Sequence, residues 1–532
     1  MSDIEDEDGR LRFVQALRLA DTGLSREELI RRLDETPIAV VVGKQTAGSL
    51  ATQTTALTAV NLLGRLFRPL IIVAPEDAYT HSRLPFIQGP FAVALAAFAG
   101  RVHPDVRAEL RDDPPAGAIV LHVSDPDAVA DPGRVHCAGA GWLSRVARHP
   151  LPPLFPRDEN PVGPLVAAAL GVAELFKLVL GDVLSGVVPA EEVAFSSLTY
   201  RVGDLEVGDL EVGPPLMGGH LPESVLVGAG SIGSAFLWGL AHLPIVSGKL
   251  TIADPDRLKR HNLDRAILVL DGTAALEPEK APWARDLIKS WLPKLDITPF
   301  SGTIRQYVNT LSPDYRLPLA ISAVDSIESR RDIQDALPER ILNASTGPTK
   351  VEVSRHDVLG EGPCLYCLYI PEVLERSPLH IAMDRTGFEQ RYVAELMVPD
   401  GKRLLSDGNV RGVERRNNLP PGTLKPYVGR RLPELLQDQI WYSQAPVSTE
   451  SGRALVTTAF VSALAGFLLL AEAIKEAEPA LASYRLSRVY EQELLATPNE
   501  FIYPGEPDVT GYCLCHSPLR RRLYRDKYPA AK

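Results

Sequence analysis

A glycine-rich turn in the middle of the chain has the residue types and spacing that a nucleotide site requires. Gly228, Gly230 and Gly233 form a GxGxxG pattern between an apolar run and a helix-forming run. Glycine lets the backbone approach a phosphate closely, and a helix N-terminus directs N–H groups and partial positive charge toward an anion. Asp254 ends the next apolar run, about twenty residues beyond the glycines, where an acid can bind the ribose hydroxyls. On its own, this pattern most often indicates NAD or FAD binding.

The segment from Asp254 to Arg265 changes that interpretation, because a dehydrogenase has no need for an Asn-x-x-Arg pattern there. It reads D-P-D-R-L-K-R-H-N-L-D-R. The segment resembles the D-x-D-x-V-x-x-S-N-L-x-R-Q pattern of the ThiF/MoeB and ubiquitin-activating superfamily, with His261 in place of the serine and Ala266 in place of the glutamine. Enzymes of that superfamily adenylate the C-terminal glycine of a ubiquitin-like protein. A capped, solvated loop is the alternative interpretation of Asn262 and Arg265.

Two further residues match the order of the superfamily's motifs. Lys280 takes the place of a lysine that contacts the nucleotide phosphates, and Asp325, which ends an apolar strand, takes the place of the aspartate that holds Mg²⁺ and ATP. A surface lysine and a helix-capping aspartate are the alternatives. The resemblance thus implies catalytic roles for Arg265, Lys280 and Asp325. The nucleotide-binding residues that it implies are Gly228, Gly230, Ser231, Ile232, Gly233, Asp254, Asp256, Asn262, Arg265, Lys280 and Asp325.

Four of the five cysteines form two close pairs, Cys364 with Cys367 and Cys513 with Cys515. Two such pairs far apart in sequence fit a tetrahedral zinc site that ties the C-terminal tail to the core. Members of the superfamily carry a structural site of this kind as CxxC…CxxC. The second pair here is CxC, which departs from the pattern and admits His516 as a substitute ligand. A disulfide, or thiols without a metal, are the alternatives.

The fifth cysteine, Cys137, lies in the first half of the chain and is expected to be a small buried hydrophobe. The superfamily's thioester cysteine lies in a P-x-C-T motif before the last helix of the adenylation domain. The corresponding segment here is Pro446-Val447-Ser448-Thr449, with serine in place of cysteine. An acyl adenylate is reactive enough to form an oxyester on Ser448, and Thr449 is the second choice. The competing interpretation makes Ser448 a helix N-cap.

The order of elements that positions these residues occurs twice along the chain. The first copy consists of a strand before Gly43, a helix after Gly48 and a following strand that ends in acids. The helices at 166–180 and 463–475 share an Ala-Glu-x-x-Lys pattern, although common composition is an alternative explanation. We therefore expect an α/β protein with two tandem Rossmann-like adenylation lobes, of which the first is degenerate and the second active. In paired members of the superfamily an arginine of the inactive lobe completes the site, which here suggests Arg10, Arg12 or Arg18.

The polar, Pro- and Gly-rich stretch after Cys367 is too long for a simple loop, and it predicts a small inserted domain. The expected divisions are an inactive lobe (1–192), a linker (193–220), the first part of the adenylation domain (221–367), an inserted domain (368–445), and the last part of the adenylation domain with the zinc-tied tail (446–532).

Composition limits the remaining classes of function. The 532 residues carry a net charge of −11, which argues against a nucleic-acid partner, and the hydrophobic share of 45% is ordinary for a soluble protein. No apolar run predicts a membrane span, the acidic first residues are not a signal peptide, and few cysteines indicate a reducing compartment. We therefore expect a cytoplasmic, pseudo-symmetric monomer.

The resemblance implies an enzyme that uses ATP and Mg²⁺, and a zinc ion, to activate a ubiquitin-like β-grasp protein for a conjugating-enzyme homologue. Two-lobed bacterial relatives of ubiquitin-activating enzymes, from phage-defence conjugation operons, are the members that it resembles most. Such a protein would serve antiviral defence. A sulfur-carrier-protein adenylyltransferase of the thiamin or molybdopterin type is the main alternative. An NAD-dependent oxidoreductase and a non-catalytic scaffold are the others.

Overall fold

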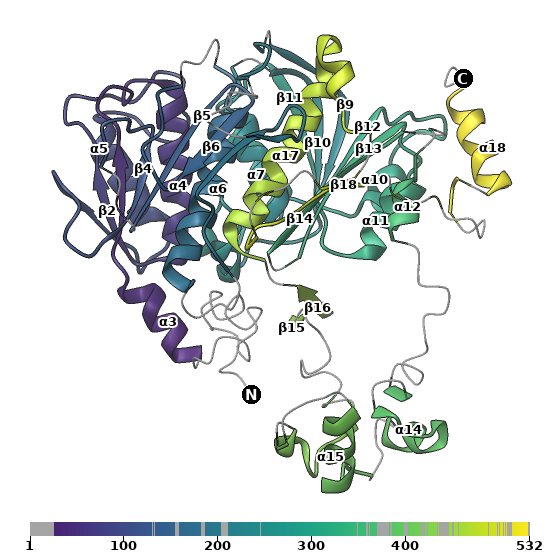
Figure 1. Cartoon of the computed structure of the whole chain (residues 1–532). Helices are drawn as coiled ribbons and strands as arrows, with labels where there is room; N and C mark the ends of the chain where they lie inside the picture. Colours follow the sequence, from purple (N-terminus) through teal and green to yellow (C-terminus); the bar gives the residue numbers. More distant parts are fainter. Residues whose placement is uncertain are drawn as a thin grey trace. The chain divides into compact units, whose positions relative to one another are not determined.

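The structure is a computed structural model (Figure 1). It describes residues 26–129, 131, 133–154, 159–181, 187–203, 211–216, 218–244, 246–347, 349–357, 360, 362–369, 382–383, 386–397, 403–416, 421–422, 424–432, 435, 446–449, 452–455, 457–487, 489–496, 498, 501–503, 505, 507, 513–515 and 517–529. The chain divides into two compact units, Met1–Tyr369 with Val456–Lys532, and Ile370–Leu455. The first and larger unit contains both lobes.

The first lobe is built on an eight-stranded sheet in the order β3-β2-β1-β4-β5-β6-β7-β8. The strands from β3 to β5 pair in parallel, and the pairs from β5 to β8 are antiparallel. Short β-branched runs such as IAVVV and PLIIV form its parallel centre, as expected of buried parallel strands. The bounds are β1 (Ile38–Val42), β2 (Pro69–Val73), β3 (Arg107–Leu110), β4 (Ile119–Val123), β5 (Arg134–Ala140), β6 (Leu143–Ala147), β7 (Glu192–Ser196) and β8 (Val202–Gly203).

The second lobe repeats this sheet strand for strand, in the order β11-β10-β9-β12-β13-β14-β17-β18. Its pairs are again parallel from β11 to β13 and antiparallel from β13 to β18. The shared topology confirms the predicted tandem α/β lobes. The bounds are β9 (Gly219–Val227), β10 (Val246–Ala253), β11 (Leu295–Phe300), β12 (Leu319–Ser322), β13 (Arg340–Thr346), β14 (Lys350–Asp357), β17 (Val489–Glu493) and β18 (Ile502–Tyr503).

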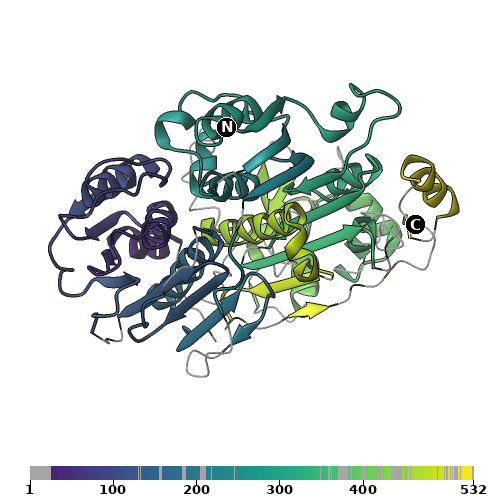
Figure 2. The same ribbon diagram turned by 90° about the horizontal axis from the view of Figure 1, so that it is seen from above.

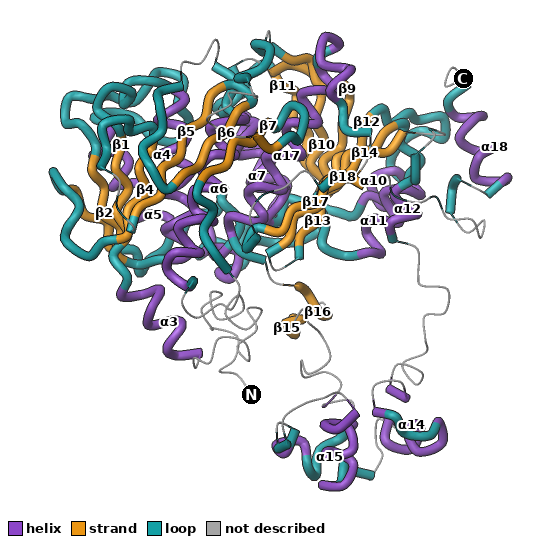
Figure 3. Tube along the Cα trace, in the orientation of Figure 1, coloured by secondary structure: helices purple, strands orange, loops and turns teal. Residues whose placement is uncertain are grey.

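Helices that are apolar along almost their whole length pack between the lobes. Figure 1 shows α6, α7 and α17 side by side near the centre, α17 contacts both of the others, and Figure 3 shows the strands of the sheets around them. In α7 and α17, glycines permit close approach, because a Cβ at Gly239 would lie 2.6 Å from Leu470.

The helices of this unit are α3 (Arg26–Glu35), α4 (Leu50–Leu66), α5 (Phe91–Val102), α6 (Val162–Leu180), α7 (Ser231–Ala241), α8 (Asp271–Ala274), α9 (Lys280–Lys289), α10 (Ile304–Val308), α11 (Ile327–Asp335), α12 (Leu365–Leu368), α17 (Ala459–Ala477) and α18 (Pro518–Lys527), with 3-10 turns η1 (Arg260–Asp264) and η3 (Pro479–Tyr484).

The two Ala-Glu-x-x-Lys helices carry the same buried ion pair. The Lys177 Nζ lies 2.7 Å from Glu174 Oε1 in α6, and the Lys475 Nζ lies 2.7 Å from Glu472 Oε1 in α17. In each pair the second carboxylate oxygen accepts a hydrogen bond from a backbone N–H of the segment after the helix, at 2.8 and 2.9 Å. Shared contacts of this kind support equivalence of the helices by descent rather than by composition.

Of the described helices, α6 is long and apolar enough to cross a membrane. However, 94% of its most apolar window is buried inside the protein, which is the environment of a core helix. Figure 2, seen from above, shows the helices and sheets of the two lobes from a second direction.

The first lobe extends beyond the boundary at residue 192 that the sequence suggested. Most of β7 and all of β8 lie in the stretch 193–220, where we expected a linker. That stretch contains a tandem repeat of Gly-Asp-Leu-Glu-Val, a pattern that by itself indicates an exposed connector. Because β7 pairs antiparallel with β6, the first residues of the stretch 193–220 belong to the sheet instead.

The second unit, Ile370–Leu455, has a small core of its own. Buried residues of α14 (Gln390–Met397) and α15 (Asp407–Arg416), among them Val393, Leu396, Val410 and Val413, pack together there with those of 424–435 near η2 (Lys425–Tyr427). A hairpin of β15 (Pro446–Thr449) and β16 (Gly452–Leu455) ends the unit. We had expected residues from 446 onward to belong to the adenylation domain.

Candidate functional site

The glycine turn between β9 and α7 is shaped by two close backbone contacts. Gly228 has φ +95°, and a Cβ there would lie 2.6 Å from the carbonyl oxygen of Ala323. A Cβ at Gly233 would lie 2.0 Å from the carbonyl oxygen of Gly228. Gly230 differs, because it is the N-cap of α7, no side chain caps the helix there, and no atom lies within 4 Å of a Cβ position. The first N–H groups of α7, beginning at Ser231, therefore have no side-chain cap, and N–H groups of this kind at a helix N-terminus can bind an anion.

Asp254, at the end of β10, holds this turn in place. Its side chain is buried, with Oδ2 accepting from the Ala229 N–H at 2.7 Å and Oδ1 accepting from the Asp256 N–H at 2.9 Å. Burial raises the pKa of the Asp254 carboxyl, and the nearby Lys280 opposes that shift. Since each carboxylate oxygen has a second lone pair, Asp254 can still accept a ligand hydroxyl.

Lys280 joins this group from the first residue of α9. Its Nζ lies 2.8 Å from Asp256 Oδ2 and 3.9 Å from Asp254 Oδ1, and its backbone N–H donates to the Asp256 carbonyl. The lysine is largely buried rather than on the surface. We call Asp254, Asp256 and Lys280 the acid–lysine cluster, and it places one cation and two carboxylates beside the glycine turn.

Asn262 and Arg265 lie in the loop that follows the cluster. The Asn262 Oδ1 accepts from the Lys259 N–H at 2.8 Å, so this side chain caps η1, but Asn262 is buried and not solvated as the alternative interpretation proposed. Arg265 ends η1 and is half-buried, and its N–H donates to the Asn262 carbonyl. We call residues 260–269 the Arg265 loop.

Asp325 lies at the same edge of the sheet as the glycine turn, beyond β12. That strand pairs with β9, and the Ala323 N–H donates to the Val227 carbonyl at 2.9 Å. The cap of α11 is Ser326, whose Oγ accepts from Ser329, so the helix-capping alternative for Asp325 is wrong. The carboxylate is exposed and remains available to a ligand.

A buried polar pair beneath this edge was not anticipated from the sequence. The Ser322 Oγ donates to Asn343 Oδ1 at 2.9 Å between β12 and β13, and both residues are fully buried. The corresponding register pair of the first sheet is Val123 with Cys137. A serine and an asparagine inside apolar strands were the available signal.

At the equivalent turn of the first lobe the helix N-terminus carries a side-chain cap, although a Cβ at Gly48, like one at Gly230, would meet no atom within 4 Å. A Cβ at Gly43 would lie 2.2 Å from the Ser124 carbonyl oxygen, so the tight turn persists. The N-cap of α4, however, is Ser49, which accepts from the Thr52 N–H at 3.1 Å. The Gln53 side chain donates to the Ala47 carbonyl at 2.8 Å. The acids after β2, Glu76 and Asp77, are exposed, unlike Asp254.

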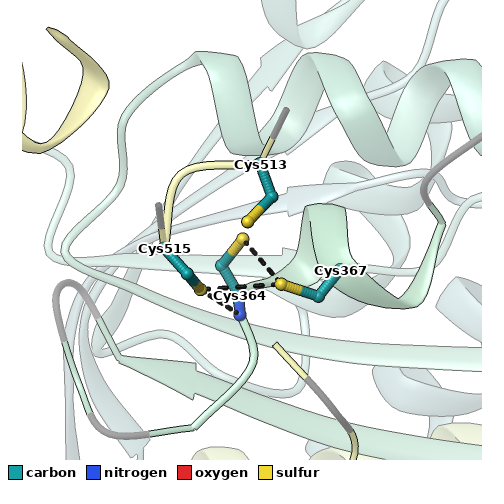
Figure 4. A group of neighbouring side chains, drawn as sticks. All are labelled: Cys364, Cys367, Cys513 and Cys515. Atoms are coloured by element: carbon teal, nitrogen blue, oxygen red, sulfur yellow. Dashed lines mark hydrogen bonds between the residues drawn. The ribbon is translucent and has the colours of Figure 1, made fainter. Parts of the chain in front are cut away.

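The two cysteine pairs meet at the start of α12. Figure 4 shows the four sulfur atoms directed toward one another, and all four lie within 4.8 Å of each other. The Cys364 and Cys367 Sγ atoms are 3.7 Å apart and those of Cys367 and Cys515 are 3.5 Å apart. A disulfide has an S–S distance near 2.05 Å, so the disulfide alternative is wrong, whereas this spacing suits four thiolates around zinc. His516 lies outside the described residues. We call Cys364, Cys367, Cys513 and Cys515 the cysteine cluster.

Two other predicted roles concern acyl transfer. Cys137 is buried in β5, and burial raises the pKa of its thiol to about 12, which suits a small hydrophobe and not a nucleophile. Ser448 lies in β15 opposite Arg453, and Thr458 is the N-cap of α17. The helix-cap interpretation of Ser448 is therefore wrong. Its side chain, like the candidate arginines Arg10, Arg12 and Arg18, lies outside what the structure describes.

Comparison with known families assigns both lobes. Residues 223–487 match the ThiF family, and the glycine turn and the acid–lysine cluster lie within that match. Residues 37–190 match the BilD N-terminal domain. The second lobe is thus similar to the ThiF family and the first to the BilD N-terminal domain.

The individual relatives share a low percentage of identical residues with this chain. The uncharacterized protein y4jF of Sinorhizobium fredii (strain NBRC 101917 / NGR234) is 26% identical over 503 residues, which cover 93% of this chain and 92% of that protein. Among solved structures, Escherichia coli MccB with ATP is 13% identical with a TM-score of 0.33, covering 55% of this chain and 66% of that one. PaaA is 13% identical with a TM-score of 0.28, covering 51% of this chain and 69% of that one.

Proposed function

We propose that this protein uses ATP and Mg²⁺ to adenylate the C-terminal glycine of a ubiquitin-like, β-grasp protein for a conjugating-enzyme homologue. The observation that supports this most is the open N-terminus of α7 at Gly230, beside the acid–lysine cluster of the second lobe. The partner class rests on the first lobe, because BilD is a component of bacterial ubiquitin-like conjugation operons. In this proposal the protein acts in the bacterial cytoplasm, in antiviral defence.

In the proposed reaction the glycine carboxylate attacks the α-phosphorus of ATP, giving an acyl adenylate and pyrophosphate. Catalysis of this kind depends on positioning and on neutralising phosphate charge. The glycine turn holds the phosphates and Asp254 the ribose, while Arg265 and Lys280 offset phosphate charge. Asp325 supplies an exposed carboxylate of the kind that Mg²⁺ prefers.

The activated glycine then passes to an acceptor, for which we propose Ser448. In this step the serine oxygen forms an ester bond with the glycine carbonyl, AMP leaves, and the hydroxyl proton goes to solvent. The position of Ser448 in the hairpin of the second unit, rather than at a helix cap, supports the proposal. The cysteine cluster holds one structural zinc ion, because four thiols at this spacing match its preferred ligand set.

The test is ATP–pyrophosphate exchange with full-length protein and the β-grasp protein encoded beside it. We expect exchange to require the β-grasp protein and its C-terminal glycine. Asp325→Asn should abolish exchange, because the neutral amide is a poor Mg²⁺ ligand and the Ser326 cap of α11 stays intact. Glu328→Gln, which alters an exposed acid in the first turn of the same helix, is the matched control and should leave exchange unchanged.

Failure to exchange with any β-grasp protein would overturn the proposal. Exchange confined to a sulfur carrier of thiamin or molybdopterin synthesis would instead establish the alternative adenylyltransferase.

A further inference from the structure

A fully buried arginine of the first lobe binds the Arg265 loop of the second. Arg65, near the end of α4, donates from Nη1 to the Leu263 carbonyl and from Nη2 to the carbonyls of Ile267 and Val269, at 2.9 and 3.0 Å. Its Nε and Nη2 also donate to Asn61 Oδ1, one turn earlier in α4. The Asn61 Nδ2 in turn donates to the Ile267 carbonyl at 2.9 Å. Two side chains of one helix therefore hold both ends of a short loop in the other lobe.

The environment of Arg65 is unfavourable for a charge. The residue is 0% exposed, and burial lowers its pKa to about 9, with only Asp264 opposing that shift. Its hydrogen-bond acceptors are carbonyl oxygens and an amide, not a carboxylate. Taking a cation out of water is costly unless its hydrogen bonds are made with good geometry. The planar guanidinium can serve several carbonyls at once, which a lysine cannot.

The carbonyls bound by Arg65 flank Arg265 on both sides in sequence. Leu263 precedes it and Ile267 and Val269 follow it. Leu263, Ala266 and Val269 also pack into a small apolar cluster, so the backbone of the loop is fixed from two directions. The first lobe thus helps to fix the backbone on both sides of Arg265.

We propose that Arg65 is a positioning residue for adenylation, through which the first lobe holds the Arg265 loop in its active shape. The inference rests on the proposed function, because it takes Arg265 to act on the nucleotide phosphates. The donors of Arg65 are already used on the loop and on Asn61, so its role is indirect. The first lobe then contributes to the chemistry although the helix after its own turn is capped by Ser49.

The experiment compares full-length Arg65→Lys and Arg65→Met with wild type in two assays. Hydrogen exchange should accelerate at the amides of Ala266 and Val269, which are hydrogen-bonded within the loop, and stay unchanged in α7. Pyrophosphate exchange at saturating ATP should fall about 10- to 100-fold in Arg65→Met, as for other displaced catalytic groups. Arg65→Lys, which keeps the charge and the stem, should retain the fold and lie between wild type and Arg65→Met.

Arg68→Met is the matched control. Arg68 is also buried and follows the C-cap of α4, but it donates to Gly64 and lies near Asp34 and Asp105 of the first lobe. This variant should lose stability without faster exchange in the Arg265 loop. Folded Arg65→Lys with wild-type behaviour in both assays would overturn the inference. If wild type itself shows no pyrophosphate exchange, the proposed function fails. The inference about Arg65 fails separately if amide hydrogen exchange in the Arg265 loop is as slow in the Arg65 variants as in wild type.

Discussion

At the scale of the residue, Asp254 shows why one acid must follow the glycine turn. One oxygen fixes the turn through Ala229 and the other fixes the following loop through Asp256, so the side chain is structural before any ligand arrives. The first lobe has acids after β2 that are exposed, and Ser49 and Gln53 make hydrogen bonds at its turn. The two turns therefore differ in which side chains bind the backbone at the helix N-terminus.

The acyl acceptor gives a prediction at the same scale. Ser448→Ala should keep pyrophosphate exchange, because adenylation precedes transfer, but should lose the covalent adduct. The wild-type adduct should survive thiol reductant and yield to hydroxide, as an oxyester does, and Ser448→Cys should make it thiol-sensitive. Mass spectrometry of the trapped reaction measures this. An adduct on Cys137, or undiminished conjugation by Ser448→Ala, contradicts the prediction.

At the scale of the element, the N-terminus of α7 separates the roles of the three glycines. Gly228 and Gly233 make close backbone contacts that exclude a Cβ, whereas Gly230 borders open space with an ordinary negative φ of −75°. We therefore expect Gly228 and Gly233 to be required for folding, and Gly230 to be required to keep the helix end accessible.

Gly230→Ser tests this separation, because it copies the cap that Ser49 provides in the first lobe. The hydroxyl should accept a helix N–H, change stability by no more than about 1 kcal/mol, and weaken ATP binding measured by calorimetry. Gly233→Ala should instead lower the melting temperature, since its Cβ would lie 2.0 Å from the Gly228 carbonyl oxygen. Unchanged ATP affinity in folded Gly230→Ser would count against the assignment of the phosphate site.

The C-terminal helix α18 gives a second prediction for an element. Its Tyr524 packs into the core and accepts from the Gln334 side chain at 2.7 Å, while Cys513 and Cys515 anchor the preceding turn. Elemental analysis should find about one zinc per chain, since structural zinc contributes folding energy. Cys364→Ser or chelation should speed tryptic cleavage at the exposed Arg522 and Arg525. Metal-free protein with unchanged cleavage would refute the zinc site.

Much of the second lobe could be predicted from sequence because its motifs are local. The glycine turn, Asp254 and Lys280 are joined by direct contacts, as the resemblance to the superfamily implied. Arg65 could not be found in this way. Polar residues of a helix ordinarily indicate a solvated face, and only the approach of the other lobe buries this one. Likewise, the strand that contains Ser448 depends on its partner β16, not on the helix that follows.

At the scale of the whole molecule, the two sheets have the same strand order, and of the two helices that follow their glycine turns only α7 begins without a side-chain cap. We therefore expect one ATP per chain, bound in the second lobe. Calorimetry with full-length protein measures the stoichiometry, and Asp325→Asn should weaken binding in the presence of Mg²⁺. Two equivalent sites per chain would show that the first lobe also binds nucleotide.

The order of synthesis has a consequence for the second sheet. Strand β14 pairs with β17, which lies beyond the second unit and α17, and Cys367 meets a cysteine 148 positions later. While the ribosome is still making this last part of the chain, β14 is an open edge strand, and such edges invite pairing with other chains. Only a chain that includes β17 and Cys515 can close the edge and complete the cysteine cluster, so we expect a product that ends before β17 to be aggregation-prone.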